Sequence, residues 1–310
     1  MTFAIITHPD CAQHETPPGH PERADRYRAV ETALASSDFA SAARVQAPLA
    51  DDAPILRAHP AAYVEKIVSS EPEQGWASLD PDTHMSPGSV RAARFAAGAN
   101  VKAVDMVMGG DAKSAFCFVR PPGHHAEKAT AMGFCLFANA AIAALHAIEA
   151  HGAKKVVIAD FDVHHGNGSQ DIFWSDPRVV VATSQQHPLW PGTGLEHETG
   201  AGNIFNAPLP PHTGGDGFRR AWEDRLLPAI DDHAPDLIVI SAGFDAHRDD
   251  PLANLNLLEP DFEWITGRLC DLADKHCGGR VVSTLEGGYD LDALASSTAA
   301  HCKVLMERAA

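Results

Sequence analysis

The chain has 310 residues, of which 45% are hydrophobic and 21% charged, a composition typical of a globular protein with a full core. The formal net charge of −17 argues against an extended contact with nucleic acid. The sequence shows no signal peptide and no apolar run long enough to cross a membrane, and its six cysteines form no CxxC pair. We therefore expect a cytoplasmic protein without a disulfide framework that binds neither nucleic acid nor membranes.

Apolar runs rich in β-branched residues alternate along the chain with alanine-rich segments of helical length. In chain order the predicted elements are a strand at 3–7, a helix at 89–108, a strand at 115–119, a helix at 138–150, strands at 156–159 and 179–183, a helix at 218–232, a strand at 237–241, a helix at 260–275 and a strand at 281–285. This alternation predicts an α/β fold with a parallel sheet covered on both faces. No repeat, linker or change in composition divides the sequence, so one catalytic domain over residues 1–310 is expected.

A cluster of acids and histidines follows the predicted strand at 156–159. Asp162 and His164 are two residues apart, so their side chains leave an extended backbone on the same face. Asp245 stands just beyond the strand at 237–241, at the sheet edge where ligands bind in open α/β folds. Two carboxylates and one imidazole suit a divalent ion such as zinc, with an open position for water. The alternative is that Asp245 only caps the loop after its strand.

Two further loops carry candidate catalytic groups. The strand at 115–119 leads into a rigid Arg-Pro-Pro-Gly turn and then His124 and His125, whose side chains can exchange protons near neutral pH. Tyr289 follows two glycines after the strand at 281–285, and its hydroxyl could donate a hydrogen bond to a developing oxyanion. The competing interpretations are an exposed histidine pair and a core tyrosine.

Together these segments resemble the histone deacetylase superfamily, which has the arginase–deacetylase fold. The matching segments, in the family's order, are 20–23 (HPER), 120–126 (RPPGHHA), 133–135 (GFC), 160–168 (DFDVHHGNG), 191–194 (PGTG), 242–245 (AGFD) and 286–289 (EGGY). They span nearly the whole chain. The resemblance implies a three-layer α/β/α fold with a mostly parallel eight-stranded sheet. It also implies a zinc-dependent deacetylase or amidohydrolase that removes an acyl group from an amine, often acetyl-lysine.

The resemblance also implies roles for individual residues. At the catalytic centre these are the zinc ligands Asp162, His164 and Asp245, the tandem histidines His124 and His125, the carbonyl-polarising Tyr289, Asp160 behind His124, and Asn167 behind His125 as in the class II branch. Along the substrate tunnel they are Gly123, Phe134, Trp190, Leu252 and the rim residue Asp82, for which a solvated turn is an equal interpretation. Because Asp160 is charged and Asn167 is not, we expect His124 to stay protonated and His125 to act as the neutral base.

The family often binds potassium, and the resemblance implies two sites built largely from backbone carbonyls. The first corresponds to Asp160, Asp162, His164, Ser184 and Gln185. The second corresponds to Phe173, Asp176, Val179 and Phe205. Backbone oxygens suit a hard monovalent ion, but side-chain identity constrains them poorly.

Leu252 bears on the choice of substrate. Relatives that prefer acetylpolyamines can carry a glutamate at the matching position, and leucine lacks the charge that would attract a second amine. We therefore favour an acyl-lysine peptide or a small acyl-amide and keep an acetylpolyamine amidohydrolase as the alternative. A non-catalytic acyl-lysine binding module would not need the full set of ligands, histidines and tyrosine, and an arginase-like ureohydrolase would need two metals. The sequence leaves open the oligomeric state, a homo-oligomer included, and the choice between zinc and iron.

Overall fold

A computed structural model describes residues 2–310, and an eight-stranded sheet forms its centre. The strands are β1 (Phe3–Thr7), β2 (Ala43–Gln46), β5 (Ser114–Cys117), β6 (Val156–Asp160), β7 (Val179–Gln186), β8 (Ile204–Leu209), β9 (Leu237–Ala242) and β10 (Val281–Leu285). Every pairing in this sheet is parallel, and the strand order is β2-β1-β5-β10-β9-β6-β7-β8. A separate antiparallel pair joins β3 (Ala77–Ser78) to β4 (His84–Met85).

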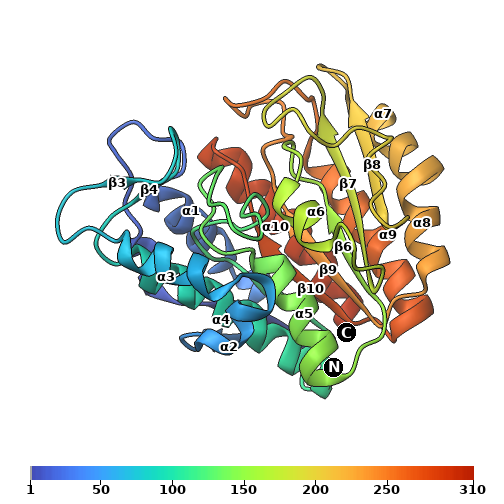
Figure 1. Cartoon of the computed structure of the whole chain (residues 1–310). Helices are drawn as coiled ribbons and strands as arrows, with labels where there is room; N and C mark the ends of the chain where they lie inside the picture. The colour runs from blue at the N-terminus through green and yellow to red at the C-terminus, as the bar shows by residue number, and fades with distance from the viewer. Residues whose placement is uncertain (1) are drawn as a thin grey trace.

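Helices cover both faces of the sheet, which gives three layers (Figure 1). On one face α4 and α5 pack on the central strands and α2 packs on α5, whereas α1, α10, α9 and α8 cover the other face. The helices are α1 (Ala24–Leu34), α2 (Asp52–Ala58), α3 (Ala61–Ser69), α4 (Ser89–Gly109), α5 (Asn139–His151), α6 (Asn167–Phe173), α7 (Gly215–Ala221), α8 (Leu227–His233), α9 (Glu259–Cys277) and α10 (Leu291–Ala309). Short 3-10 turns η1 (Pro9–Gln13) and η2 (Ser37–Phe39) and a π-helical turn η3 (Trp222–Leu226) complete the described elements.

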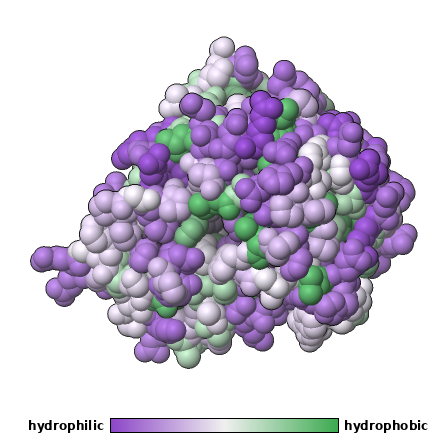
Figure 2. All heavy atoms as spheres, turned by 90° about the horizontal axis from the view of Figure 1, so that it is seen from above, coloured by the Kyte–Doolittle hydropathy of each residue, from purple (hydrophilic) through white to green (hydrophobic). Residues whose placement is uncertain are grey.

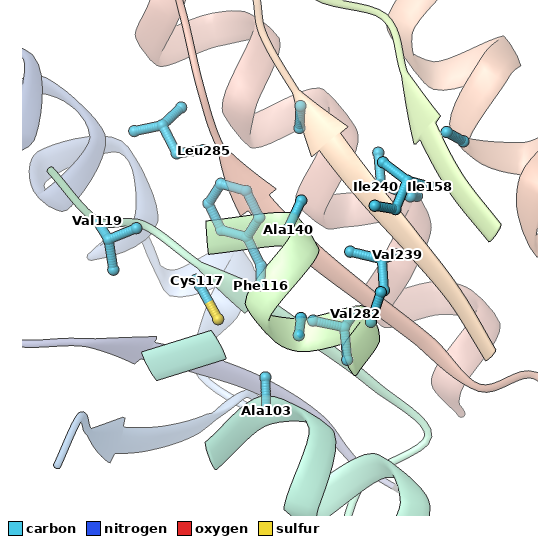
Figure 3. Close-up of a cluster of buried hydrophobic side chains, with 14 of the residues drawn as sticks. Ala103, Phe116, Cys117, Val119, Ala140, Ile158, Val239, Ile240, Val282 and Leu285 are labelled. Atoms are coloured by element: carbon cyan, nitrogen blue, oxygen red, sulfur yellow. The ribbon is translucent and has the colours of Figure 1, made fainter. Parts of the chain in front are cut away.

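The hydrophobic core lies where α4 and α5 meet the central strands. Figure 3 shows Ala103 of α4 and Ala140 of α5 beside Phe116 of β5 and aliphatic residues of β6, β9 and β10. Small side chains let these helices approach their neighbours closely. At Gly98 of α4 an added Cβ would lie 1.9 Å from the carbonyl oxygen of Pro48, so only glycine fits there.

The six predicted strands are all present, within three residues of their predicted ends, and the sheet is entirely parallel rather than mostly parallel. The sequence interpretation missed β2 and β8, the two edge strands. β2 alternates between half-buried and exposed residues over only four positions, and β8 contains Asn206 and Pro208, so neither is a continuous apolar run. The predicted helix at 218–232 lies within the continuous segment α7–η3–α8, and α1, α2, α3, α6 and α10 were not predicted.

Strand order explains why segments far apart in sequence meet. The strands β5, β10, β9 and β6 are neighbours in the sheet, and all point the same way. The loops that follow them carry the tandem histidines, Tyr289, Asp245 and the Asp162–His164 pair, respectively. The fold therefore gathers all of these candidate catalytic groups at one edge of the sheet.

Within residues 2–310, no helix is both long and apolar enough to cross a membrane. All six cysteines are buried and unpaired in this part of the chain. Their burial agrees with the sequence-based expectation of buried thiols, while the cytoplasmic location stays a prediction.

Candidate active site

Three predicted ligands meet at the carboxyl ends of β6 and β9. The His164 Nδ1 atom lies 3.0 Å from Asp245 Oδ2 and 3.3 Å from Asp162 Oδ1. One ligand atom from each residue falls within 4.8 Å of the other two. Backbone N–H groups orient the carboxylates: Gly287 donates to Asp162 Oδ2 at 2.8 Å, and Val163 donates to Asp245 Oδ1 at 2.9 Å.

Two glycines make room for these carboxylates. A Cβ added at Gly243 would lie 2.0 Å from Asp162 Oδ2, and one added at Gly287 would lie 2.2 Å from Asp245 Oδ2. The glycines of the AGFD and EGGY segments are therefore needed because the backbone passes directly against the ligand oxygens.

The charges of this triad fit a divalent cation. Burial and the negative charge of Asp162 raise the pKa of Asp245 to about 7. Burial disfavours the charged form of His164, but its hydrogen bonds to Asp162 and Asp245 raise its pKa to about 10. Without a metal the triad thus retains protons to limit the repulsion between its two fully buried carboxylates. A divalent ion could replace that positive charge, so the residues present suit zinc.

The tandem histidines differ in what lies behind each ring. His124 Nδ1 is 3.0 Å from Asp160 Oδ2, and its Nε2 is 3.7 Å from Asp162 Oδ2. Burial lowers the pKa of His124, but Asp162 and Asp160 outweigh burial and raise it well above 6.5. Burial and the nearby rings of His124 and His164 lower the pKa of His125 well below 6.5. These directions agree with the sequence-based expectation of a protonated His124 and a neutral His125.

Hydrogen bonding also assigns the tautomer of His125. The Asn167 amide nitrogen donates to Glu127 Oε1 at 2.9 Å and to Met132 Sδ at 3.2 Å, so its Oδ1 is the atom that faces the ring. That oxygen lies 2.8 Å from His125 Nδ1, which must therefore carry the hydrogen. The lone pair of neutral His125 is then on Nε2, the ring nitrogen left free to accept a proton.

A cavity of about 220 Å³ joins these groups to the surface. It is lined by Asp82, His125, Gly133, Phe134, His164, Leu189, Trp190, Leu252 and Tyr289. Four of the five predicted tunnel residues are in this lining. Figure 2 shows a hollow bordered by hydrophobic residues near the centre of the face that it views.

The prediction that Gly123 lines the tunnel is corrected by the structure. Gly123 is not in the cavity lining, and its backbone N–H donates to Glu286 Oε2 at 2.7 Å. An added Cβ would lie 2.5 Å from the backbone nitrogen of Asn139, so Gly123 is packed against the start of α5. The cavity glycine is Gly133, where a Cβ would lie 2.4 Å from the His125 ring.

The two aromatic walls are held in different ways. Trp190 meets the His125 ring edge-on at 4.7 Å between centroids and is 41% exposed, as suits a wall at the mouth. Phe134 has a φ of 68°, which is rare for a bulky residue and is found where function or packing requires it. Its ring meets those of Tyr289 and His20 edge-on at 5.8 and 4.8 Å.

An arginine behind Tyr289 was not predicted from the sequence. Arg26 of α1 is fully buried, and its guanidinium carbon lies 4.8 Å from the Tyr289 ring centroid. It donates to the carbonyl oxygens of Gly288 at 2.6 Å and Glu286 at 2.5 Å. Arg26 therefore fixes the backbone that carries Tyr289. No matched segment contains Arg26, so the sequence offered no signal for it.

Glu22 neutralises the buried arginines of this region. Its carboxylate accepts from Arg26 at 3.1 Å and from Arg120 at 2.5 and 2.6 Å. Burial raises the pKa of Glu22, but Arg120 overrides it and lowers the pKa to about 2. Both Glu22 and Arg120 lie in matched segments, and their role became visible only from the contact between them.

A second histidine and carboxylate group lies on α4 and α5. The Nε2 atoms of His146 and His151 are 2.7 and 2.8 Å from the same oxygen, Asp105 Oδ1. Arg57 approaches His146 Nδ1 at 2.5 Å, which makes this nitrogen an acceptor and leaves the ring hydrogen on Nε2. Hydrogen bonds alone therefore account for this grouping.

The residues of the first implied potassium site lie together at the ends of β6 and β7. Asp160 pairs with Thr183, next to Ser184 and Gln185, and Asp162 and His164 follow in the adjoining loop. The occupancy of this site by potassium stays a prediction.

Comparisons with known sequences agree with this arrangement. Residues 20–305 match the family described as the histone deacetylase domain. An uncharacterized protein of Synechocystis is 40% identical over 98% of this chain and 99% of its own length. A histone deacetylase-like amidohydrolase of Pseudomonas aeruginosa is 39% identical over 87% of this chain and 73% of its own length. A probable deacetylase of Archaeoglobus fulgidus is 35% identical over 94% and 82%, respectively.

The fold has a close counterpart among solved structures. The crystal structure of the HDA15 HD domain matches with a TM-score of 0.94 and 35% identity, covering 99% of this chain and 88% of that chain. This match confirms the predicted arginase–deacetylase fold. From the family match, the relatives and the fold together, the chain belongs to the histone deacetylase family of deacetylases and amidohydrolases.

Proposed function

We propose that this chain is a zinc-dependent amidohydrolase that cleaves the amide of an acylated amine, with acyl-lysine as the favoured substrate. One observation carries the proposal. A single cavity is lined at once by a candidate metal ligand (His164), a candidate base (His125), a candidate oxyanion donor (Tyr289) and two aromatic walls. A binding module would have no use for this combination.

Asp162, His164 and Asp245 would hold the zinc ion. When bound, zinc would supply Lewis-acid polarisation of the amide carbonyl and lower the pKa of water. The same ligand set also suits iron, so metal analysis of the protein as purified is part of the test.

The two histidines would divide the proton transfers between them. His125 Nε2 would take a proton from the attacking water and then return it to the departing amine. Asn167 would hold the tautomer of His125 that this needs. His124, paired with Asp160, would stay protonated and support the negative charge that develops on the carbonyl oxygen.

Tyr289 would donate its hydroxyl hydrogen to the same carbonyl oxygen. None of the side-chain hydrogen bonds formed among residues 2–310 uses this hydroxyl, while Arg26 holds the backbone just before Tyr289 through the carbonyls of Glu286 and Gly288. Burial raises the pKa of Tyr289 well above 10, so the phenol keeps its proton at neutral pH. It is therefore preorganised as a donor.

The walls of the cavity favour an acyl-lysine or a simple acyl-amide. Phe134 and Trp190 can flank the apolar stem of a lysine, and Leu252 adds an apolar surface without charge. Asp82 at the rim could accept a backbone N–H of a peptide substrate. An acetylpolyamine is the alternative substrate, although Leu252 offers no charge to a second amine.

The test is turnover of a panel by wild type and Tyr289→Phe, each stripped of metal and reloaded with zinc. The panel contains acetyl-, trifluoroacetyl- and longer acyl-lysine peptides and acetylated polyamines. We expect zinc-dependent turnover of an acyl-lysine peptide that collapses in Tyr289→Phe. Stoichiometric zinc without turnover of any compound would contradict the enzymatic proposal and favour a binding role.

A further inference from the structure

Asn203 fills a position for which the family resemblance implied a cation. Its Nδ2 atom lies 2.9 Å from the carbonyl oxygen of Phe173, 3.1 Å from that of Asp176 and 2.8 Å from that of Val179. We call these three oxygens the carbonyl triplet. They come from three of the four residues that correspond to the second potassium site.

We propose that the side-chain amide of Asn203 replaces the second potassium ion in this chain, so that the carbonyl triplet binds no cation. The donor set does not fit a cation while this amide stands among the oxygens, because its N–H groups already use them. The role of the ion in joining the end of α6 to the start of β7 passes to a neutral side chain.

The orientation of the Asn203 amide follows from its other contact. Its Oδ1 atom accepts the backbone N–H of Ala201 at 3.0 Å, so the nitrogen must be the atom that faces the carbonyl triplet. Gly200 and Gly202, with φ of +54° and +86°, turn the chain back so that this contact can form. Asn203 is only 3% exposed, so water does not compete freely for these bonds.

Two carbonyls of the triplet also accept a backbone N–H, and each still has a lone pair for Asn203. The Asp176 N–H donates to the Phe173 oxygen at 3.1 Å, and the Val179 N–H donates to the Asp176 oxygen at 3.2 Å. A carbonyl can accept two hydrogen bonds, and the donor–acceptor distances to Asn203 lie in the usual N–H···O range. The amide nitrogen has two hydrogens for three oxygens, so one of its hydrogens is shared between two carbonyls. Phe173 ends α6, where carbonyls lack helical partners and need one from elsewhere.

No negative charge remains at the triplet for an ion to neutralise. The Asp176 carboxylate binds Arg178 at 2.7 to 3.2 Å. Phe205, the fourth residue of the implied site, pairs with Ala182 within the sheet. Asn203 sits just before β8, and its own carbonyl accepts from Val181 at 3.0 Å. This end of β8 therefore contributes an amide donor to the triplet.

The first test uses the wild-type protein in crystals soaked with thallium(I), a potassium mimic with a strong anomalous signal. We expect no anomalous peak within the carbonyl triplet. A thallium peak there, with the Asn203 side chain displaced, would overturn the proposal. This test requires no variant to fold.

The second test opens the triplet with Asn203→Ala and uses Asn100→Ala as the control. Asn100 is a buried asparagine of α4 that donates to Ala96 and Thr284 and faces no such triplet. Melting temperatures are compared in potassium chloride and choline chloride at equal ionic strength. We expect Asn203→Ala to melt roughly 4 °C or more below wild type in choline and to regain most of that loss in potassium.

The melting temperature of Asn100→Ala should lie below that of wild type by the same amount in potassium chloride and in choline chloride. Thallium should appear in the triplet of Asn203→Ala. If Asn203→Ala gains no potassium response and binds no thallium there, the triplet is not a latent cation site and the proposal fails.

Discussion

Two groups in this molecule bring histidine and carboxylate atoms close enough to bind a metal, yet their surroundings differ. Asp162, His164 and Asp245 stand at the carboxyl ends of two central strands, and both of their carboxylates are fully buried. Asp105 and His151 lie on the helical layer, where the Asp105 side chain is 45% exposed. In each group one ligand atom from each of the three residues lies within 4.8 Å of the other two.

The difference lies in charge and in what holds the oxygens. The first group sets two buried carboxylates against one imidazole, and burial leaves Asp245 with a pKa raised to about 7. The second group sets one carboxylate against two imidazoles, with Arg57 adding a further positive charge. Nearby ligand atoms alone do not make a metal site. Excess buried negative charge, fixed oxygens and an open cavity do.

The largest expected effects test this difference by activity. Asp245→Ala should abolish turnover, and Tyr289→Phe should lower kcat by about 10²–10³-fold because an oxyanion donor is lost. Asp105→Ala should keep kcat/KM within about twofold of wild type, since it touches no part of the cavity. Steady-state assays with the best acyl-lysine peptide measure all three. A folded but inactive Asp105→Ala protein would contradict the claim that the second group has no part in catalysis.

Metal content distinguishes the two groups directly. After gel filtration in zinc, wild type should retain about one zinc ion per chain. Asp245→Asn should retain little, because it removes one charge and one ligand oxygen, whereas His151→Ala should match wild type. Inductively coupled plasma mass spectrometry gives the stoichiometry. Two zinc ions per wild-type chain, falling to one in His151→Ala, would show that the second group is also a metal site.

The histidines beside the first group should differ in effect. His125→Ala removes the proposed base and should slow single-turnover hydrolysis by about 10²–10⁴-fold. His124→Ala should slow it less, because His124 supports charge without transferring the proton. The measurement uses zinc-loaded enzyme in excess over substrate. If His125→Ala kept most of its rate while His124→Ala lost it, the assignment of the base would be wrong.

The sequence predicted those features that are set by local sequence patterns. β6 and β9 were predicted because burial on both faces makes them continuous apolar runs, while the edge strands β2 and β8 were not. The pairing of Asp162 with His164 follows from their two-residue spacing, which is a local property. The sequence therefore indicated two ligands of the metal triad from local spacing, whereas the position of Asp245 beside them depends on the strand order.

Features that depend on tertiary packing could not be predicted. Gly123 and Gly133 both lie near the histidines in sequence, and only the folded loop shows that Gly133 faces the cavity. Arg26 reaches Tyr289 from α1 across a separation of more than two hundred residues. The Asn203 amide donates to backbone oxygens, and every residue type has such an oxygen, so the sequence does not identify these contacts.

The smallest expected effect is a pH dependence of stability at the second group. Burial lowers the pKa of His146 below 6.5, outweighing the carboxylate of Asp105. Below pH 6.5 the unfolded chain therefore binds a proton at His146 that the folded chain does not bind. As the pH is lowered further, the free energy of unfolding decreases until the pH reaches the pKa of His146 in the folded protein.

His146→Gln removes this difference, so its free energy of unfolding should decline less steeply below pH 6.5 than that of wild type. The difference in the free energy of unfolding should be under about 1 kcal/mol, because Asp105, the partner of His146, is partly exposed and screened by solvent. Urea unfolding at a series of pH values between neutral and mildly acidic measures it. Equal slopes in the two proteins would mean that the folded protein holds His146 no differently from the unfolded chain. The second group would then contribute nothing to the pH dependence of the free energy of unfolding.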